Sequence, residues 1–274
     1  MEDKEITPFT PDELRRYINA RAEKDYLLVD VRQPGEYGNA HIPGAMLLPL
    51  PELESKLFSL PSDRDLVFYC HVGGRSLAAA DLAAGAEVTE KRVFHLDGGI
   101  MAWDGKVLPG FPRVKVFDKT AGHDALLMTA MDLEKGAFRF YGHLRDNWPE
   151  ASFSKTVADL ALAETAHAQA IYRFWRQTVS NPPTFEDLFE DLRGDILEGG
   201  ESLAEVMDRV RNAGDNPCMV VLETALSIEY AAYDLYRTMA EQVESDDVRQ
   251  AFLSISQAEK AHMRKLTAAI SDCP

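Results

Sequence analysis

Glutamate and histidine residues recur in this sequence in two copies that are 95 residues apart. Each copy has a lone glutamate, a tyrosine seven residues later, and a Glu-x-x-His motif that begins thirty residues after the lone glutamate. The matching pairs are Glu134 and Glu229, Tyr141 and Tyr236, Glu164 and Glu259, and His167 and His262. Four carboxylates buried in an apolar interior need a cation between them, so the repeat predicts a metal site.

Each copy lies on segments that have the apolar periodicity of amphipathic helices. Around Glu134, for example, Leu127, Met131 and Phe138 recur at steps of three and four residues, and the carboxylate interrupts this apolar stripe. Four helices of about 25 residues would form a bundle in which two supply one Glu and two supply Glu-x-x-His on a single face, the ligand set of a dinuclear site. One long crossover is typical of ferritin connectivity. The predicted connections are residues 146–153, 179–216 and 243–247.

Residues 122–272 resemble the ferritin-like superfamily and are nearest to the rubrerythrin-type proteins. The resemblance rests on the paired glutamates, the two Glu-x-x-His motifs and the tyrosine that follows each lone glutamate. It implies a site with two iron ions, or an Fe/Mn or Mn pair, for chemistry with O2 or peroxide. Four carboxylates balance two divalent ions, and carboxylate with imidazole suits iron or manganese. The implied ligands are Glu134, Glu164, His167, Glu229, Glu259 and His262.

Two features of the rubrerythrins are missing. They carry an additional glutamate in a Glu-x-x-Glu motif, but here Leu226 and Ala232 stand three residues either side of Glu229, which predicts a symmetric site. The Cys-x-x-Cys pairs of a rubredoxin module are also missing, so an external electron donor is expected. Tyr141 and Tyr236 lie on the ligand face, either as core aromatics or as hydrogen-bond donors to the ligand carboxylates.

The first part of the chain alternates short apolar runs with helical patterns. This alternation predicts a buried parallel sheet, and chemistry in such folds collects at the carboxyl ends of the strands. Asp30, Cys70 and Asp97 stand at those ends. The predicted strands are residues 26–30, 45–48, 66–70 and 92–96, and the helical patterns are residues 11–21, 51–59 and 75–85.

A glycine-rich loop follows the third predicted strand and opens into a helix. Its residues are Cys70, His71, Val72, Gly73, Gly74, Arg75 and Ser76. The two glycines let successive backbone N–H groups curl toward an anion, while the helix N-terminus and the arginine add positive potential. A cysteine placed there should have a lowered pKa and be a thiolate near neutral pH.

Five motifs in order resemble the rhodanese domain, over roughly residues 5–110. They are Asp30–Arg32, Glu36–Tyr37, His41–Ala45, the Cys70 loop, and Leu96–Ile100 followed by Ala102–Trp103. The resemblance implies sulfane-sulfur transfer, in which Cys70 takes sulfur from a small-molecule donor, holds it as a persulfide and passes it to a thiol acceptor. Loop amides and Arg75 would stabilise the persulfide. A tyrosine-phosphatase loop needs five residues between its cysteine and arginine to wrap a phosphate. Here there are four, which favours a single sulfur atom as the transferred group.

Two histidines of these motifs carry different expectations. His41 belongs to the turn motif of the rhodanese domain, so we expect it to be structural. His71 lies inside the Cys70 loop, where it either tunes the choice of substrate or is an exposed bystander.

The expected architecture is an α/β rhodanese-like parallel-sheet domain followed by an all-α ferritin-like four-helix bundle. The predicted boundaries are residues 1–112 for the first domain, 113–121 for a linker and 122–274 for the bundle. The acidic residues of the long connection, Glu198 among them, are interpreted as a solvated cover. Isolated ferritin-like domains commonly dimerise, so a homodimer is also expected.

Charge and cysteine content limit the partners and the compartment. The net charge of −16 argues against nucleic acid and anionic membranes as partners. No signal peptide or membrane-spanning apolar run is recognised, and three cysteines fit a reducing cytosol, so a cytoplasmic protein is expected. Cys218 and Cys273 either resolve a Cys70 persulfide or are ordinary packing residues.

Two functions are compatible with these patterns. The first is a sulfurtransferase fused to a di-iron oxidase or peroxidase. The second is a sulfur carrier that sequesters metal without turnover at the bundle.

Overall fold

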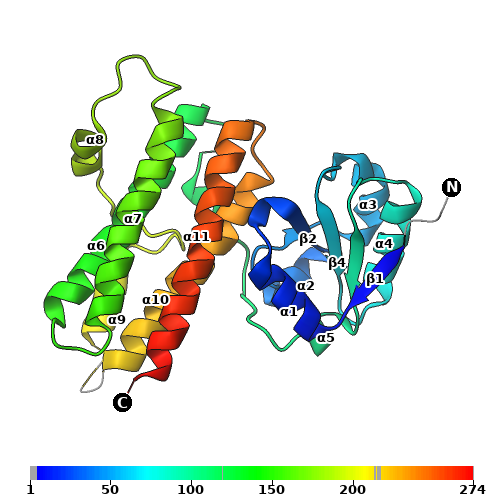
Figure 1. The fold of residues 1–274 in the computed structure, drawn as a ribbon, viewed down its shortest axis with the longest axis horizontal. Coiled ribbons are helices and arrows are strands. Elements are labelled where there is room, and N and C mark those ends of the chain that lie inside the picture. Colours follow the sequence, from blue (N-terminus) through cyan, green and yellow to red (C-terminus); the bar gives the residue numbers. More distant parts are fainter. Residues whose placement is uncertain (1–4, 119, 213, 215–216, 274) are drawn as a thin grey trace. The chain divides into compact units, whose positions relative to one another are not determined.

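The computed structural model describes residues 5–118, 120–212, 214 and 217–273 (Figure 1). The chain forms two compact units, Met1–Phe111 and Pro112–Pro274. The division falls just before the segment 113–121 that was predicted to be a linker, and this segment lies in the second unit. Its short helix η3 (Val114–Val116) leads into Phe117, which is 3% exposed and packs against Phe252.

The first unit is built on a parallel five-stranded sheet in the order β1-β5-β4-β2-β3. Strands β2 and β4 are neighbours inside the sheet. Both are buried along their whole length, as expected for a parallel sheet covered on both faces. The strand β1 was not predicted, because four residues that include Pro8 give a weak strand signal and are tolerated only at an edge. The strands are β1 (Ile6–Phe9), β2 (Tyr26–Asp30), β3 (Met46–Leu47), β4 (Asp65–Tyr69) and β5 (Val93–Leu96).

Short helices connect these strands. Thr10 and Glu13 form a reciprocal capping box at the start of α1, which satisfies two N-terminal donors of that helix. The helices are α1 (Pro11–Ala20), η1 (Glu23–Asp25), α2 (Pro34–Asn39), α3 (Leu50–Lys56), η2 (Leu57–Ser59), α4 (Gly74–Gly85) and α5 (Gly99–Ala102).

The second unit is a four-helix bundle with one long crossover, as predicted. Its main helices are α6 (His123–Asn147), α7 (Ser154–Trp175), α10 (Pro217–Ala240) and α11 (Asp246–Ser271). Their apolar faces meet in two buried clusters, which lie along the bundle on either side of its polar residues. The crossover between α7 and α10 holds two short helices, α8 (Phe185–Asp191) and α9 (Leu203–Arg211), and the segment between them runs back onto α6 and α10.

Cys218 and Cys273 form a disulfide that ties the first turn of α10 to the residues after α11. The two residues were expected to resolve a Cys70 persulfide or to be ordinary packing residues, and no pairing was predicted; among the described residues only Cys70 is free. Sequence alone could not show the pairing, because it depends on two antiparallel helices bringing residues of distant sequence together.

Reducing this disulfide, or replacing Cys218 with serine, is expected to destabilise the bundle. The bond closes a loop with a sequence separation of 55 residues. In the chain-entropy model such a loop contributes about 4 kcal/mol by restricting the unfolded chain. Urea unfolding with and without a phosphine reductant measures the difference, and superimposable curves would contradict the prediction.

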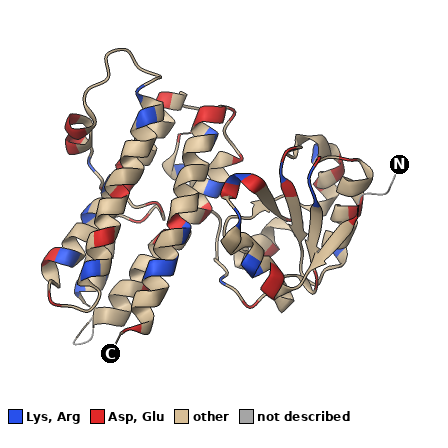
Figure 2. Cartoon of the chain, in the orientation of Figure 1, with Lys and Arg blue, Asp and Glu red and all other residues tan. Residues whose placement is uncertain are grey.

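Charged residues are interspersed along the elements of both units in the view of Figure 2. Among the described residues, no helix is both long enough and apolar enough to cross a bilayer.

Candidate functional site

The six predicted metal ligands come together in the interior of the bundle. Helix α6 supplies Glu134 and α10 supplies Glu229, while α7 and α11 each supply a Glu-x-x-His pair. The four carboxylates are at most 2% exposed. Because they are flanked by the two apolar clusters, their charges have no access to bulk water, and only their own partners can compensate them.

Each imidazole meets carboxylates from three helices. His167 Nδ1 lies 3.0 Å from Glu164, 3.1 Å from Glu134 and 3.4 Å from Glu259. His262 Nδ1 lies 3.1 Å from Glu229, 3.1 Å from Glu259 and 3.2 Å from Glu164. A ring nitrogen carries at most one hydrogen, so one nitrogen cannot satisfy three carboxylates by hydrogen bonding.

The donor set fits a pair of metal ions. The Oε1 atom of Glu164 and the Oε2 atom of Glu259 are buried without a hydrogen bond, although each lies near His262 Nδ1, at 3.2 and 3.1 Å. This leaves lone pairs that a cation would use. One ligand atom from each member of the two Glu-x-x-His motifs lies within 4.8 Å of all the others. Glu164 and Glu259 each approach both histidines, so they are placed to be shared between two ions, whereas Glu134 and Glu229 each approach one.

Tyr141 and Tyr236 hydrogen-bond to the lone glutamates. Tyr236 Oη donates to Glu134 Oε1 at 2.6 Å, and Tyr141 Oη donates to Glu229 Oε1. Each tyrosine therefore holds the glutamate of the opposite copy of the repeat. Such bonds fix the orientation of a carboxylate and leave its second oxygen directed at the histidine.

Burial and the neighbouring charges raise the pKa values of the lone glutamates and of both histidines, and lower those of Glu164 and Glu259. Burial raises the pKa of Glu134 to about 8, and burial followed by the charge of Glu259 raises the pKa of Glu229 well above its ordinary value. Burial alone would lower the pKa values of His167 and His262, but the surrounding carboxylates raise both. Without metal, the cluster therefore holds protons that metal ions would have to displace.

The metal-free protein is expected to lose stability as the pH rises from 6 to 8. In this window folded Glu134, with a pKa of about 8, keeps a proton that the unfolded chain, with a pKa of 4.5, has released. Stability falls where the folded state binds more protons, by about 2 kcal/mol for this group over the window. The raised pKa values of the histidines act in the same direction, while the lowered pKa values of Glu164 and Glu259 act below pH 4.5.

Urea unfolding in a chelator at the two pH values tests this. The metal-loaded protein should show the opposite trend, because the ligands must be deprotonated to bind. A metal-free midpoint that is constant or higher at pH 8 would contradict the linkage.

Glu198, in the segment between α8 and α9, was missed as a residue of this cluster. It was placed in a solvated acidic cover, but it is 2% exposed. Burial, followed by the charges of Glu134 and Glu164, raises the pKa of its carboxyl well above the ordinary value. The other acidic residues of that stretch are exposed or half-buried. The signal available in the sequence was the glycine pair directly after this acid.

The second candidate site is the Cys70 loop at the carboxyl end of β4. The Gly73 N–H donates to Cys70 Sγ at 3.1 Å, and Gly73 adopts a φ of +100° as it leads into α4. A positive φ of this size favours glycine, which explains the residue type at this position. The loop thus turns its backbone amides toward the sulfur.

The Leu96–Ile100 motif and the residue after it pack against this loop and hydrogen-bond to its backbone. The N–H groups of Ile100 and Met101 donate to the carbonyls of Cys70 and His71 at 2.8 and 3.1 Å. At Gly99, whose φ is +59°, a Cβ would stand 2.5 Å from the Cys70 carbonyl oxygen. Only glycine allows the two loops to approach so closely, which gives this motif its physical role.

Hydrogen bonds lower the pKa of the Cys70 thiol. Burial raises it, but bonds from Ser76 and from the amides of Gly73 and Val72 outweigh that effect. Cys70 is 1% exposed, while His71 and Val72 beside it are exposed. The arrangement stabilises a thiolate, the reactive form of cysteine, within a ring of N–H donors.

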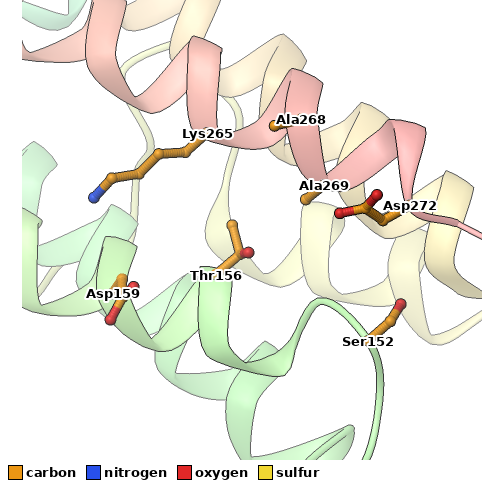
Figure 3. Close-up of a pocket in the computed structure, with 7 residues that line it drawn as sticks. All are labelled: Ser152, Thr156, Asp159, Lys265, Ala268, Ala269 and Asp272. Atoms are coloured by element: carbon orange, nitrogen blue, oxygen red, sulfur yellow. The ribbon is translucent and has the colours of Figure 1, made fainter.

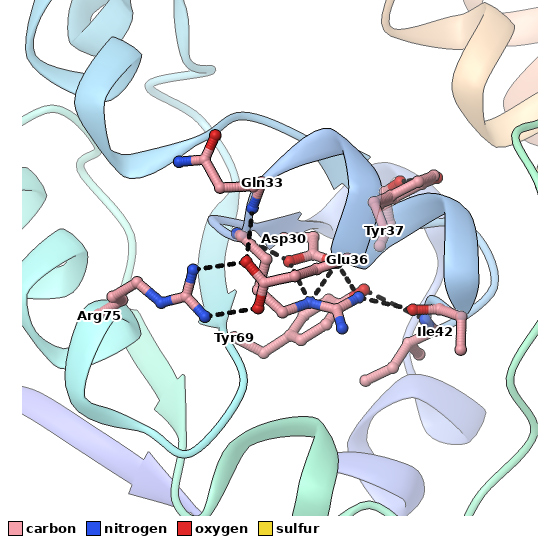
Figure 4. A network of polar contacts seen from close by, with 10 residues as sticks. Asp30, Gln33, Glu36, Tyr37, Ile42, Tyr69 and Arg75 are labelled. Atoms are coloured by element: carbon pink, nitrogen blue, oxygen red, sulfur yellow. Dashed lines mark hydrogen bonds and ion pairs between the residues drawn. The ribbon is translucent and has the colours of Figure 1, made fainter.

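Arg75 is paired with Glu36 rather than directed at the sulfur alone. Its two Nη atoms lie 2.8 and 2.7 Å from the Glu36 carboxylate, and Figure 4 shows the two groups face to face. The hydrogen bond from Arg75 lowers the pKa of Glu36 to about 2. The arginine was expected to stabilise the persulfide directly, but among the groups that lower the pKa of Cys70 the backbone amides and Ser76 dominate.

The remaining strand-end residues have structural partners. Asp30 accepts hydrogen bonds from the guanidinium of Arg32 in a buried pair, part of the network in Figure 4. Asp97 accepts a bond from the Gly98 N–H. His41 stacks on Tyr37 at a centroid distance of 4.0 Å, as expected for a structural residue.

A separate cavity lies between α7 and α11. Figure 3 shows Lys265 and Asp159 at one end of it and Ser152 and Asp272 at the other. None of the residues that line it belongs to the carboxylate cluster.

Comparisons with known proteins match a domain family in each unit. A rhodanese-like domain matches residues 10–106, and a rubrerythrin domain matches residues 221–273. A sulfurtransferase of Allochromatium vinosum is 41% identical over 86 residues, which cover 31% of this chain and 78% of that protein. The probable adenylyltransferase/sulfurtransferase MoeZ of Mycobacterium tuberculosis is 40% identical over 102 residues, which cover 36% of this chain and 25% of MoeZ.

Among solved structures, a rhodanese-related protein of Thermoplasma volcanium is 26% identical, with a TM-score of 0.33, over 37% of this chain and 97% of that one. The rubrerythrin match covers α10 and α11, and the internal repeat extends the same ligand pattern to α6 and α7. The chain therefore belongs to the rhodanese family through its first unit and carries a rubrerythrin domain in its second.

Proposed function

We propose that the protein transfers sulfane sulfur through a Cys70 persulfide and that its bundle holds two iron ions for redox chemistry with O2 or peroxide. The observation that carries the first half is the Gly73 N–H bonded to Cys70 Sγ in a loop that lowers the pKa of the thiol. The second half is supported by six converging ligands, of which the four carboxylates are buried and two approach both histidines.

The sulfur transfer consists of two displacements. The Cys70 thiolate attacks the outer sulfur of a donor such as thiosulfate, a new S–S bond forms, and sulfite leaves with the electron pair of the broken bond. An acceptor thiolate or cyanide then attacks the terminal sulfur, and Cys70 leaves as a thiolate. The loop amides that bind the thiolate would also bind the persulfide anion, and Arg75 with Glu36 holds the start of α4 in place.

In the bundle, the protein holds and orients the ions. A bound metal pair would supply the electrons that reduce O2 or peroxide. Glu164 and Glu259, which approach both histidines, would hold the ions together with the other four ligands, and the tyrosines fix the orientation of Glu134 and Glu229. The apolar clusters on either side exclude bulk water from these groups.

The competing function is a sulfur carrier that sequesters metal without turnover. Steady-state consumption of hydrogen peroxide by the iron-loaded protein, with a chemical reductant as electron source, separates the two. Turnover that is lost on chelation supports the redox function, whereas stable iron binding without peroxide consumption supports sequestration.

The proposal also includes partners and a compartment. The partners are a small-molecule sulfur donor, a thiol acceptor and an external electron donor, with a second copy of the chain as a homodimer, and neither nucleic acid nor membrane. A cytoplasmic location would supply the thiol acceptor. There the Cys218–Cys273 bond would be exposed to cellular reductants, which make disulfides uncommon in that compartment.

A further inference from the structure

The segment between α8 and α9 runs directly against the bundle. At Gly136 of α6, a Cβ would stand 2.4 Å from the Ile196 carbonyl oxygen, and at Gly194 a Cβ would stand 2.8 Å from the Gly136 nitrogen. Further along, a Cβ on Gly199 would stand 3.3 Å from that of Ala231 in α10. The segment therefore reaches between α6 and α10, the two helices that carry the lone glutamates, and glycines make this approach possible.

Hydrogen bonds hold the segment in this place. The N–H groups of Arg193 and Gly194 donate to Asp132 at 2.8 and 3.0 Å. Arg139 of α6 donates to the Gly194 carbonyl at 3.0 Å and pairs with Asp195 at 2.9 Å. Asp132 and Arg139 lie on either side of Glu134 in the sequence of α6, so the segment is bound to this helix both before and after a predicted metal ligand.

Glu198 is the acidic residue that this segment delivers to the interior. It is 2% exposed, and its Oε2 atom is buried without a hydrogen-bond partner. The charges of Glu134, Glu164 and Glu259 act on its carboxyl, and its charge in turn acts on the hydroxyl of Tyr236. A buried carboxylate oxygen with no partner is costly, unless a cation uses its lone pairs.

We propose that Glu198 is a seventh ligand of the metal pair, a fifth carboxylate supplied by the crossover segment instead of a bundle helix. The inference rests on the proposed metal site and changes one of its predicted properties. With Leu226 and Ala232 around Glu229 the site was expected to be symmetric, but Glu198 lies on the crossover between α7 and α10, outside the four helices that carry the repeat. The two metal positions are therefore inequivalent.

The fifth carboxylate also changes the charge balance. Four carboxylates neutralise two divalent ions, whereas five neutralise one divalent and one trivalent ion. Glu198 should therefore favour the oxidised state of one iron, and its removal should raise the midpoint potential of that iron.

The test compares Glu198→Gln with the matched control Glu201→Gln, which removes one charge from the same segment at a residue paired with exposed Arg209. Each metal-free protein is titrated with Fe2+ anaerobically, and thermal unfolding is followed before and after loading. Wild type and control should bind two ions per chain. Glu198→Gln should weaken binding of one ion by about tenfold or more, the scale of losing a group that supports a metal site. Its metal-free unfolding temperature, compared with that of the wild type, shows whether the variant is folded before loading.

A second variant separates ligation from charge. Glu198→Asp keeps the carboxylate but shortens its reach by one methylene, so it should also weaken one ion if Glu198 is a ligand. Wild-type affinity for iron in both variants would overturn the proposal. Wild-type affinity in Glu198→Asp alone would show that Glu198 acts through its charge and not as a ligand, which would also overturn the proposal. A wild-type protein that binds no iron would instead overturn the proposed metal site.

Discussion

Replacing Glu164 with alanine is expected to abolish binding of both metal ions. Glu164 approaches His167 at 3.0 Å and His262 at 3.2 Å, so its removal affects both positions. A ligand present at a hundred times its dissociation constant stabilises a protein by about 2.7 kcal/mol per site. Two sites therefore contribute about 5 kcal/mol, or about 10–20 °C in unfolding temperature for a unit of this size. Chelation of the wild type should lower the unfolding temperature by the same amount.

Metal content and calorimetry measure these effects together. Glu223→Ala is the matched control, because Glu223 is exposed on α10 and lies outside the cluster. It should keep both ions and respond to the chelator as the wild type does. If Glu164→Ala retains two ions, or if chelation leaves the unfolding temperature of the wild type unchanged, the carboxylate cluster does not bind metal as proposed.

Replacing Cys70 with serine is expected to reduce thiocyanate formation from thiosulfate and cyanide to background. The hydroxyl of serine stays protonated at neutral pH and cannot form a persulfide, so the loss should be about 10³-fold or more. The Gly73 N–H that donates to Cys70 Sγ can donate to an oxygen instead, so the first unit should remain folded. Mass spectrometry after incubation with thiosulfate should show the added sulfur on the wild type and no addition on the variant.

The double variant Cys218→Ser/Cys273→Ser is the control for this result. Both residues lie in the second unit and are bonded to each other, so sulfur transfer should persist without them. Activity that survives in Cys70→Ser would contradict the assignment of the nucleophile. Activity lost in the double variant would show that one of the bonded cysteines resolves the persulfide.

Much of each site could be predicted because the residues that carry its chemistry lie close together in the sequence. The i, i+3 pairs place Glu164 with His167 and Glu259 with His262 on single helical faces, whatever the surrounding fold. The Cys70 loop is likewise contiguous, and its glycines and helix start define the anion-binding backbone. Alternating apolar runs were sufficient for the central strands β2 and β4, because a buried parallel strand is apolar on both faces.

The rest depended on contacts between residues distant in sequence. Apart from the two glycines that follow it, nothing near Glu198 distinguishes it from the exposed acids of the same stretch, and it is buried because the segment packs against Gly136. Arg75 has Glu36 as its partner because β2 and β4 are neighbours in the sheet. The sequence by itself determined which side chains can ligate metal or carry sulfur, since residue type and helical or loop spacing decide that locally. Only the tertiary structure decided which other charges meet them, because burial and pairing are set by how separate elements pack.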